Sequence, residues 1–456
     1  MALKNEVVMT EGNLLKKMFI VALPLMFTSL LQIFYNTADL IVCGLFGSSH
    51  SVAAISSTTS LSFLIINLFI GLSIGANVVF ARCFGLGNQE KGNRVVQTSL
   101  CFSIVFGFAG AIIGFTLART FLGWMNSPED VIDLSTLYMK IYFLGMPFSM
   151  IYNFGSALLR ATGDTKRPFF ILTSSGLVNV GLNLLLVIVF GLDVAGVAIA
   201  TITAQAMSAI LVLICMARNK GFLRLNLRHF RFYKKEALEI IYIGIPASIQ
   251  SLAFSLSNVV IQSSVNSLGA NVMDGNGAAA SLEGFIFVAM DAFSQAALVF
   301  VSANYAVKNF KFIKKTILYA CTIVVLLSVT LGSLFYIFDE PLIKLYVRNE
   351  EAIEAAKSRL VVFCFTYFTC AIMNILANSQ RGMGKSLEPS IVTVAGVVGF
   401  RFVWIFIFFP KEAFHSLFGI AISYPISWII TGLIHLVLII VFYKKDKAKY
   451  ELTTII

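Results

Sequence analysis

Arg160-Ala-Thr-Gly163-Asp-Thr-Lys-Arg-Pro168 follows a long apolar run, and a similar stretch, Arg381-Gly-Met-Gly384-Lys-Ser-Leu-Glu-Pro389, follows another apolar run in the second half of the chain. The arginine, one glycine and the proline keep the same spacing in both stretches. Ala22-Leu-Pro24 and Gly244-Ile-Pro246 form a second such pair, with almost the same offset along the chain. The chain is therefore predicted to contain two matching halves. A membrane protein built from two such halves encloses a site between them, which is a common plan of secondary transporters.

The composition of the 456-residue chain excludes an ordinary soluble domain. Hydrophobic residues make up 58% of it and charged residues 12%, against about 25% charged in soluble proteins, and its mean hydropathy is +0.86. Twelve apolar stretches are long enough to cross a bilayer as helices, which takes roughly 20 residues. They are residues 18–46, 52–82, 95–117, 135–159, 168–190, 194–217, 237–264, 278–306, 316–338, 357–378, 389–410 and 416–442. Because backbone groups in lipid must bond within their own segment, we predict an all-α integral membrane protein with twelve transmembrane helices.

The net charge of +11 comes from basic residues concentrated in the predicted loops and tails, and this placement does not indicate nucleic-acid binding. If both termini are cytoplasmic, 26 of the 34 lysines and arginines lie on that side, and 7, Arg359 among them, lie on the opposite side. This asymmetry predicts cytoplasmic termini by the positive-inside rule. The segment 1–17 resembles a cytoplasmic tail rather than a signal peptide. Seven cysteines without a CxxC pair indicate neither a disulfide framework nor a zinc site.

The longest polar interruption is a basic loop, residues 218–235, at the midpoint of the chain. Six predicted helices precede it and six follow, so both halves enter the membrane from the same side. The halves are therefore expected to be parallel repeats related by a pseudo-twofold axis along the membrane normal. The predicted organisation is a tail (1–17), an N-lobe (18–217), a linker (218–236), a C-lobe (237–442) and a second tail (443–456).

Three carboxylates lie well inside predicted helices: Asp39, Glu283 and Asp291. Holding a charge in the membrane costs about 3 kcal/mol or more, so each is expected to face water or a partner. Glu283 and Asp291 lie on a similar face of the eighth helix, whereas the repeat equivalent of Asp39 is Ile261. Arg401, inside the eleventh helix, needs a counter-charge, and either Glu283 or Asp291 can supply it.

Asp39 is the centre of a predicted coupling site. Tyr35 lies one turn before it on the same face, and the fifth and sixth helices offer Asn179, Asn183 and Thr201. A carboxylate among amide and hydroxyl oxygens can hold a proton or a small hard cation such as Na⁺. The alternative interpretation is a cluster of hydrogen bonds between helices.

Three further groups of residues complete the predicted site. Pro24 and Pro246 are either hinges or tolerated kinks, because proline bends a helix. The repeated loops are expected to be structural, through Arg160, Gly163, Arg381 and Gly384. The polar residues expected to line a substrate cavity are Gln32, Asn36, Asn153, Asn258 and Gln262.

Enzymatic activity is not expected from the motifs present. Gly382-Met-Gly384-Lys385-Ser386 resembles the end of a phosphate-binding loop, but Ser379 stands where the first glycine is required. ATP is therefore not expected to drive the protein, and no cofactor is expected. A membrane-embedded prenyl transferase would need clustered aspartates for metal and pyrophosphate, and the sequence has no such cluster.

Motifs spread along the chain can be compared with known transporter families. They are Leu-Pro24, Asp39 with Gly44 and Gly47, Arg82-Cys-Phe-Gly85-Leu-Gly87-Asn88, Arg160-Ala-Thr-Gly163, Asn179 with Asn183, Gly196-Val-Ala-Ile-Ala-Thr201, Gly-Ile-Pro246 and Arg381-Gly-Met-Gly384. Together they resemble the multidrug and toxic compound extrusion (MATE) family over essentially the whole chain. The resemblance implies two six-helix lobes around a central cavity that opens to one side at a time.

The resemblance also implies a function and a set of roles. Family members export organic, often cationic and amphipathic compounds in exchange for inward Na⁺ or H⁺. Asp39 would be the coupling carboxylate with Asn179, Asn183 and Thr201 as neighbours, and Glu283 is similar to an acid of the eighth helix in some bacterial members. Some positions depart from the family's pattern, and these departures leave the identity of the coupling ion open. Position 187 is Val where a number of members carry Asp, the seventh and tenth helices lack acids found in another branch, and residues 303–306 lack a Gly-Gln-Asn motif.

We therefore expect an ion-coupled efflux antiporter of the bacterial plasma membrane that acts as a monomer on small organic substrates. The coupling ion is H⁺ or Na⁺, bound at Asp39, with H⁺ preferred. The alternative is a flippase of lipid-linked oligosaccharides, which would need a strongly cationic cavity to hold pyrophosphate. Arg401 is the one base that the sequence places centrally.

Overall fold

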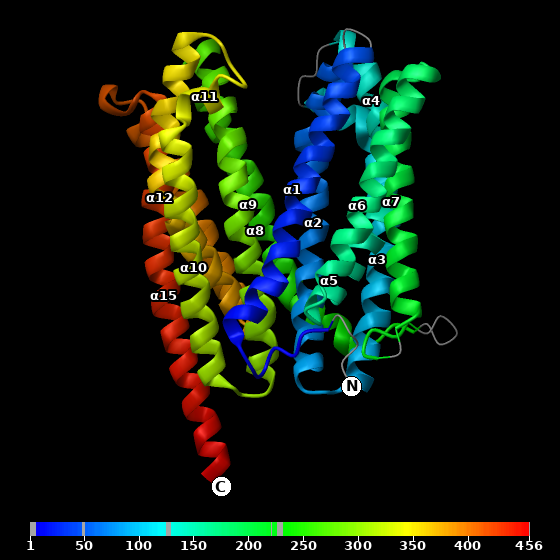
Figure 1. Cartoon of the computed structure of the whole chain (residues 1–456), viewed down its shortest axis with the longest axis vertical. Helices are drawn as coiled ribbons and strands as arrows, with labels where there is room; N and C mark the ends of the chain where they lie inside the picture. Colours follow the sequence, from blue (N-terminus) through cyan, green and yellow to red (C-terminus); the bar gives the residue numbers. More distant parts are fainter. Residues whose placement is uncertain (1–5, 48–50, 125–128, 220, 226–230, 456) are drawn as a thin grey trace. The chain divides into compact units, whose positions relative to one another are not determined.

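A computed structural model describes residues 6–47, 51–124, 129–219, 221–225 and 231–455, and every element in these ranges is helical (Figure 1). Eleven helices in the described ranges are long and apolar enough to cross a membrane. The fourth predicted span is formed by α4 (Glu129–Leu144) and α5 (Met146–Ala161), two helices of 16 residues each that are separated at Gly145. Pro147 explains the interruption, because proline cannot donate a backbone hydrogen bond to the preceding turn. The predicted all-α membrane fold is confirmed.

The chain divides into two compact units. The first unit comprises Met1–Val8 and Phe27–Ser248, and the second comprises Met9–Met26 and Ile249–Ile456. The helices that lie largely or wholly in the first unit are α1 (Leu14–Phe46), α2 (Ser51–Gly85), α3 (Gln89–Trp124), α4, α5, α6 (Lys166–Asn183), the π-helical η1 (Leu184–Val189) and α7 (Asp193–Ala217). Those of the second unit are α8 (Lys234–Asn266, in part), α9 (Ala270–Ala306), α10 (Phe310–Ile337), α11 (Asp339–Ile343), α12 (Glu350–Gly382), α13 (Leu387–Thr393), η3 (Val394–Gly399), α14 (Phe400–Val403), η4 (Trp404–Phe408), η5 (Glu412–Phe414) and α15 (Leu417–Ile455).

Two helices belong to both units. The division falls inside α1 after Met26 and inside α8 after Ser248, in each case just beyond the helix's proline. The start of α1 is held in the second unit, where the Phe19 ring packs edge-on against Phe293 at 5.2 Å between centroids. The start of α8 is held in the first unit, where the Lys91 ammonium lies 2.8 Å from the Glu239 carboxylate. The units therefore divide within helices, whereas the predicted lobes divide at the basic loop.

The repeat seen in the sequence is also present in the helix boundaries. α5 ends at Ala161 and α12 ends at Gly382, and the next helices begin at Lys166 and Leu387, so both pairs of boundaries keep the offset of the repeated loops. Gly163 and Gly384 have φ angles of 79° and 83°, a left-handed conformation that glycine adopts without strain. In each loop the amide after the glycine bonds the carbonyl of a residue in the last turn of the preceding helix, as in a Schellman helix end.

Close helix contacts in the first unit depend on glycine. A Cβ atom at Gly75 of α2 would overlap the backbone carbonyl of Ile240, and one at Gly71 would overlap Ser248. Small residues let helix backbones approach closely in a membrane, where the hydrophobic effect does not drive helices together. α2 and the first half of α8 therefore pack almost backbone to backbone.

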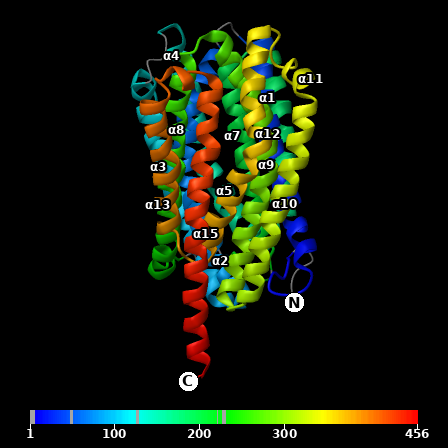
Figure 2. The same cartoon turned by 90° about the vertical axis from the view of Figure 1, so that its left-hand side faces the viewer.

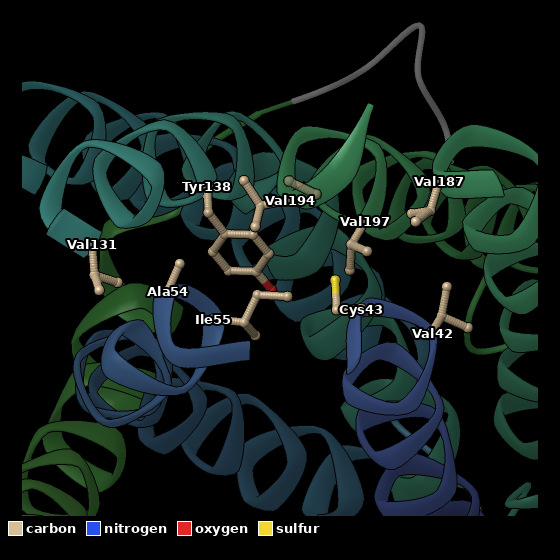
Figure 3. Close-up of a cluster of buried hydrophobic side chains, with 10 residues drawn as sticks. Val42, Cys43, Ala54, Ile55, Val131, Tyr138, Val187, Val194 and Val197 are labelled. Atoms are coloured by element: carbon tan, nitrogen blue, oxygen red, sulfur yellow. The ribbon is translucent and has the colours of Figure 1, made fainter. Parts of the chain in front are cut away.

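An apolar cluster at one end of the first unit fixes the surroundings of Asp39. Its buried residues come from α1, α2, α4, η1 and α7, and they are Val42, Cys43, Ala54, Ile55, Val131, Tyr138, Val187, Val194, Val197 and Ala198. In Figure 3 the Tyr138 ring lies between Ala54 and Ile55 on one side and the α7 valines on the other. α1 and α7, which carry predicted coupling residues, therefore pack against each other about one turn beyond Asp39, together with η1, which continues α6.

α9 and α12 pack along each other in the second unit, with α10 and α15 also against α12. Figure 2 shows the last turns of α15 extending beyond the other helices of this unit. Those turns, from Lys444 onward, are largely polar and exposed.

Candidate functional site

Asp39 lies in a chain of hydrogen bonds that joins α1, α6 and α7. The Asn183 amide donates to Asp39 Oδ1 over 2.5 Å and to Asn179 Oδ1 over 3.4 Å. The Asn179 amide in turn donates to the Thr201 hydroxyl over 3.4 Å. Asn179 and Asn183 are buried. Four of the five residues expected around the coupling site thus come together in one unit.

Asp39 has no basic partner in the described part of the chain, where its side chain accepts a hydrogen bond from Asn183. Its side chain is only partly buried. Asn183 Oδ1 is buried and has no hydrogen-bond partner there either. An unneutralised carboxylate beside an unpaired amide oxygen can accept a proton or contribute two oxygens to a small cation.

Tyr35 contacts α6 rather than Asp39. Its hydroxyl donates to the backbone carbonyl of Thr173 over 3.2 Å, and its ring lies against Gly176, where a Cβ atom would overlap it. Tyr35 is therefore a contact between α1 and α6, one turn before Asp39. Its described contacts hold the helix that carries the carboxylate.

A second carboxylate of the first unit escaped the sequence analysis. Asp193, the first residue of α7, accepts a hydrogen bond from the Ser51 hydroxyl at the start of α2. Its φ angle of 48° is unusual for a residue other than glycine. The Gly191-Leu-Asp193 turn could have signalled an acid at a helix start, but it lies at the edge of an apolar span.

Glu283 forms a buried ion pair with Arg359, which corrects the expectation that Arg401 might be its partner. Arg359 Nε and Nη2 lie 2.7 and 2.8 Å from the two Glu283 oxygens. Arg359 Nη1 donates to Asn276 Oδ1 over 2.7 Å, and the guanidinium stacks over Phe363 at 4.7 Å. Arg359, which falls inside the predicted span 357–378, lies in α12 and is 6% exposed.

Arg401 contacts aromatic rings where a carboxylate was expected. Its guanidinium carbon lies 4.0 Å from the centre of Tyr424 and 6.0 Å from those of Trp428 and Phe254. It forms no ion pair with a described residue, and its buried Nε has no hydrogen-bond partner there. Removing a charge from water costs several kcal/mol, of which cation–π contacts return about 0.5–2 kcal/mol. Arg401 is therefore an incompletely compensated charge.

Asp291 lines a small pocket between α9 and α12. The other lining residues are Phe287, Met290, Ser294, Tyr367, Cys370, Ala371 and Asn374. Cys370 and Asn374 both lie in the tenth predicted span, and the Asn374 amide is 3.7 Å from the Cys370 sulfur. Asp291 thus lies on the wall of a small pocket, and Glu283 is bonded to Arg359.

The residues expected to line a substrate cavity do not form a common cluster through the hydrogen bonds of the described residues. Gln32, Asn258 and Gln262 are exposed in the structure, and Gln262 bonds Asn266 over 2.8 Å. Asn153 donates to the Ser149 carbonyl within its own helix over 3.0 Å. The side chain of Asn36 lies outside the described residues.

The two repeated loops differ in how their arginines are held. Arg381 is buried and donates to Asn378 Oδ1 over 2.7 Å and to the Gln250 side chain of α8. Asn378 also bonds the Ser294 hydroxyl on the pocket wall over 2.8 Å. Arg160 is only partly buried. Hydrogen bonds thus connect the loop of the second unit to its pocket.

The comparisons with known proteins agree with this architecture. The profile of the MatE family matches residues 24–185 and 246–407, two segments that each begin at one of the repeated prolines, Pro24 and Pro246. The chain is 26% identical over 454 residues to the probable multidrug resistance protein YoeA of Bacillus subtilis, covering 98% of this chain and 97% of YoeA. It is 27% identical over 391 residues to the probable multidrug resistance protein YpnP of the same organism, covering 84% of this chain and 86% of YpnP.

Solved structures share the fold. One described as the outward-facing conformation of a multidrug resistance MATE family transporter of the MOP superfamily superposes with a TM-score of 0.91 at 19% identity, covering 98% of this chain and 99% of that chain. Repeats at the same spacing, apolar helices and a profile match over most of the length lead to one assignment: the chain belongs to the MatE family of membrane transporters.

Proposed function

We propose that this protein is a secondary transporter that exports organic compounds in exchange for an inward cation bound at Asp39. The observation that carries the proposal is the partly buried Asp39 carboxylate, bonded to Asn183 and without a basic partner among the described residues. An intramembrane acid of this kind marks an ion pathway by default. The names of the curated relatives, probable multidrug resistance proteins, support organic compounds as the exported substrates.

The proposed coupling works through the hydrogen bonds of Asp39. Binding of a proton neutralises the carboxylate and weakens its charge-assisted bond to Asn183, which links α1 to α6. α1 can then change its packing, bending near Pro24, and release the substrate. The ion shifts the balance between two conformations only because it binds one of them more tightly.

A proton suits this site better than Na⁺. The Asn183 amide donates to Asp39 Oδ1, so a cation would share the carboxylate with that N–H group. A proton needs no further ligand. The unpaired Asn183 oxygen is the feature that would favour Na⁺ instead, so the ions must be compared directly.

We further propose that the protein lies in the bacterial cytoplasmic membrane as a monomer with both termini in the cytoplasm, and that it uses no cofactor. The positive-inside distribution of its basic residues supports the orientation. A flippase of lipid-linked oligosaccharides is less well supported. Of the buried arginines described in the second unit, Arg359 is neutralised by Glu283, and Arg381 and Arg401 alone do not make the strongly cationic cavity that a pyrophosphate needs.

The test is substrate efflux from proteoliposomes with proton and Na⁺ gradients imposed separately. We expect a proton gradient to drive efflux and a Na⁺ gradient alone to have little effect. Asp39→Asn should abolish the response to either gradient while the folded protein is retained. The matched control is Asp133→Asn, which alters an exposed acid of α4 that pairs with Arg119 and should leave transport unchanged. Gradient-driven efflux that persists at full rate in Asp39→Asn would overturn the coupling role.

A further inference from the structure

Six lysines gather in the second unit where α10 begins and where the apolar part of α15 ends. All six are exposed, and none forms an ion pair with a described residue. The two helices touch here, because the Tyr443 hydroxyl of α15 donates to the Phe310 carbonyl of α10 over 3.2 Å and the two rings lie edge-on at 5.6 Å between centres. These residues, termed the lysine patch, are Lys308, Lys311, Lys314, Lys315, Lys444 and Lys445.

The equivalent helix start in the first unit is neutralised by its own acids. α3 and α10 begin at residues that keep the same offset as the repeated loops. On α3, the Lys91 ammonium lies 2.8 Å from the Glu239 carboxylate, and the Arg94 guanidinium lies 2.5 Å from Glu90. The first turn of α10 contains no acid. The same helix start therefore carries paired charges in one unit and unpaired positive charge in the other.

Little within the second unit offsets this positive charge. Asp446 of α15, next to the patch in sequence, accepts a hydrogen bond from the Tyr305 hydroxyl over 2.9 Å. Lys311 and Lys315 are four residues apart on α10, a spacing at which like charges destabilise a helix. An anion bound among the lysines would remove this repulsion.

The patch lies at the level where the apolar spans end. Lys315 directly precedes the predicted span 316–338, and Lys444 lies two residues after the predicted span 416–442. Side chains just outside the hydrocarbon core, which is about 30 Å thick, lie among phospholipid headgroups. Tyr443 fits this level, because tyrosine is enriched where a membrane meets water. A phospholipid headgroup is therefore the anion that reaches both helices from its normal place in the bilayer.

We propose that the lysine patch binds the headgroups of anionic phospholipids such as phosphatidylglycerol and so anchors the second unit to an anionic membrane surface. Lysine holds phosphate as a flexible point charge. Each basic residue near an anionic surface strengthens binding about fivefold. The inference is independent of ion coupling at Asp39.

The first test compares how fast individual lysines of the purified full-length protein are acetylated by an N-hydroxysuccinimide ester. The protein is placed in nanodiscs of phosphatidylcholine, with or without phosphatidylglycerol, and the modified lysines are identified by mass spectrometry. We expect phosphatidylglycerol to slow acetylation of the patch at least about fivefold, because bound headgroups cover the ammonium groups. Lys234 and Lys235 are the internal control, since they also lie exposed at a helix start, but beside Glu236. Their acetylation should slow by about twofold or less.

The second test removes charge from the patch. Binding of phosphatidylglycerol to the protein in detergent is measured by native mass spectrometry. Lys314→Gln with Lys315→Gln should weaken it at least about tenfold, and Lys314→Arg with Lys315→Arg should retain it. Lys234→Gln with Lys235→Gln removes an adjacent pair elsewhere and should change it by about twofold or less.

Several outcomes would overturn the inference. Equal slowing of acetylation at the patch and at the control lysines would show only a general attraction to the membrane, as would unchanged lipid affinity after the patch lysines are replaced. Protection of the patch by inorganic phosphate in pure phosphatidylcholine nanodiscs, to the same degree as by phosphatidylglycerol, would indicate a site for free anions. Stronger protection by a short RNA would assign the patch to nucleic acid. Loss of lipid binding with efflux intact would leave the proposed transport function standing, and the reverse result would contradict only that function.

Discussion

Glu283 and Arg359 show how strongly one side chain of a buried pair depends on the other. Glu283→Gln removes the negative charge and leaves the buried Arg359 guanidinium with neutral amide oxygens as its acceptors. Removing one partner of a buried ion pair costs about 3–5 kcal/mol. We therefore expect Glu283→Gln to unfold at a clearly lower temperature in detergent than wild type.

Two comparisons make this prediction specific. Replacing both partners, as Glu283→Met with Arg359→Met, should restore much of the lost stability, because no uncompensated charge remains. Glu340→Gln breaks exposed pairs with Lys344 and Lys357 at 2.6 and 2.7 Å and should have a smaller effect. A Glu283→Gln protein as stable as wild type would show that the pair is not formed.

The difference between Asp39 and Arg359 shows what the sequence could predict for single residues. Asp39 was recognisable because it stands alone in an apolar run, and its partners Asn179 and Asn183 are spaced one helical turn apart. Arg359 lies near the start of the predicted span 357–378, after Glu350, Glu351 and Glu354, and was counted only with the basic residues of the outer side. Its depth became clear only from the helix α12, which begins at Glu350. Charge counting gives the side of a membrane but not how far a side chain enters a helix bundle.

At the scale of elements, the contact between α2 and the first half of α8 is sensitive to side-chain size. A methyl group at Gly75 would overlap the Ile240 carbonyl, a backbone atom that cannot move away alone. Gly75→Ala should therefore lower the free energy of unfolding by about 1–3 kcal/mol, the usual range for overpacking. The measurement is thermal unfolding of the purified protein.

Gly181→Ala is the matched control, because nothing lies within 4 Å of its added methyl group. It should be neutral or slightly stabilising, since alanine favours helix by about 1 kcal/mol over glycine. Equal effects of the two substitutions would contradict the close approach of α2 and α8.

The helices themselves were largely predictable from long apolar runs, and the interruption of the fourth span was not. Residues 135–159 are predominantly apolar, so hydropathy alone indicates one helix. Gly145 and Pro147 mark the break. Glycine and proline also occur inside intact membrane helices, however, as Pro24 and Pro246 do in α1 and α8. Whether a proline bends or ends a helix depends on the neighbours that bond the freed carbonyl, which the sequence does not show.

For the whole molecule, the distribution of basic residues predicts orientation. A green fluorescent protein fused after Ile456 should fluoresce in a bacterial host, because a cytoplasmic terminus allows that reporter to fold. Alkaline phosphatase at the same position should be inactive, and fused after Lys411, in the loop before α15, it should be active. The opposite pattern of reporter activity would reverse the proposed orientation.

The sharing of α1 and α8 makes the two repeats interdependent. A chain cut in the basic loop would yield two fragments, and neither would contain a complete compact unit, since each keeps a helix end that the other needs. The fragment ending before residue 218 would lack the segment carrying Glu239, and its partner would lack Phe19. Each fragment should be degraded when produced alone and recovered when both are made in one cell. Such reciprocal rescue would show that the two repeats have exchanged the first turns of their leading helices, so that neither bundle is complete on its own.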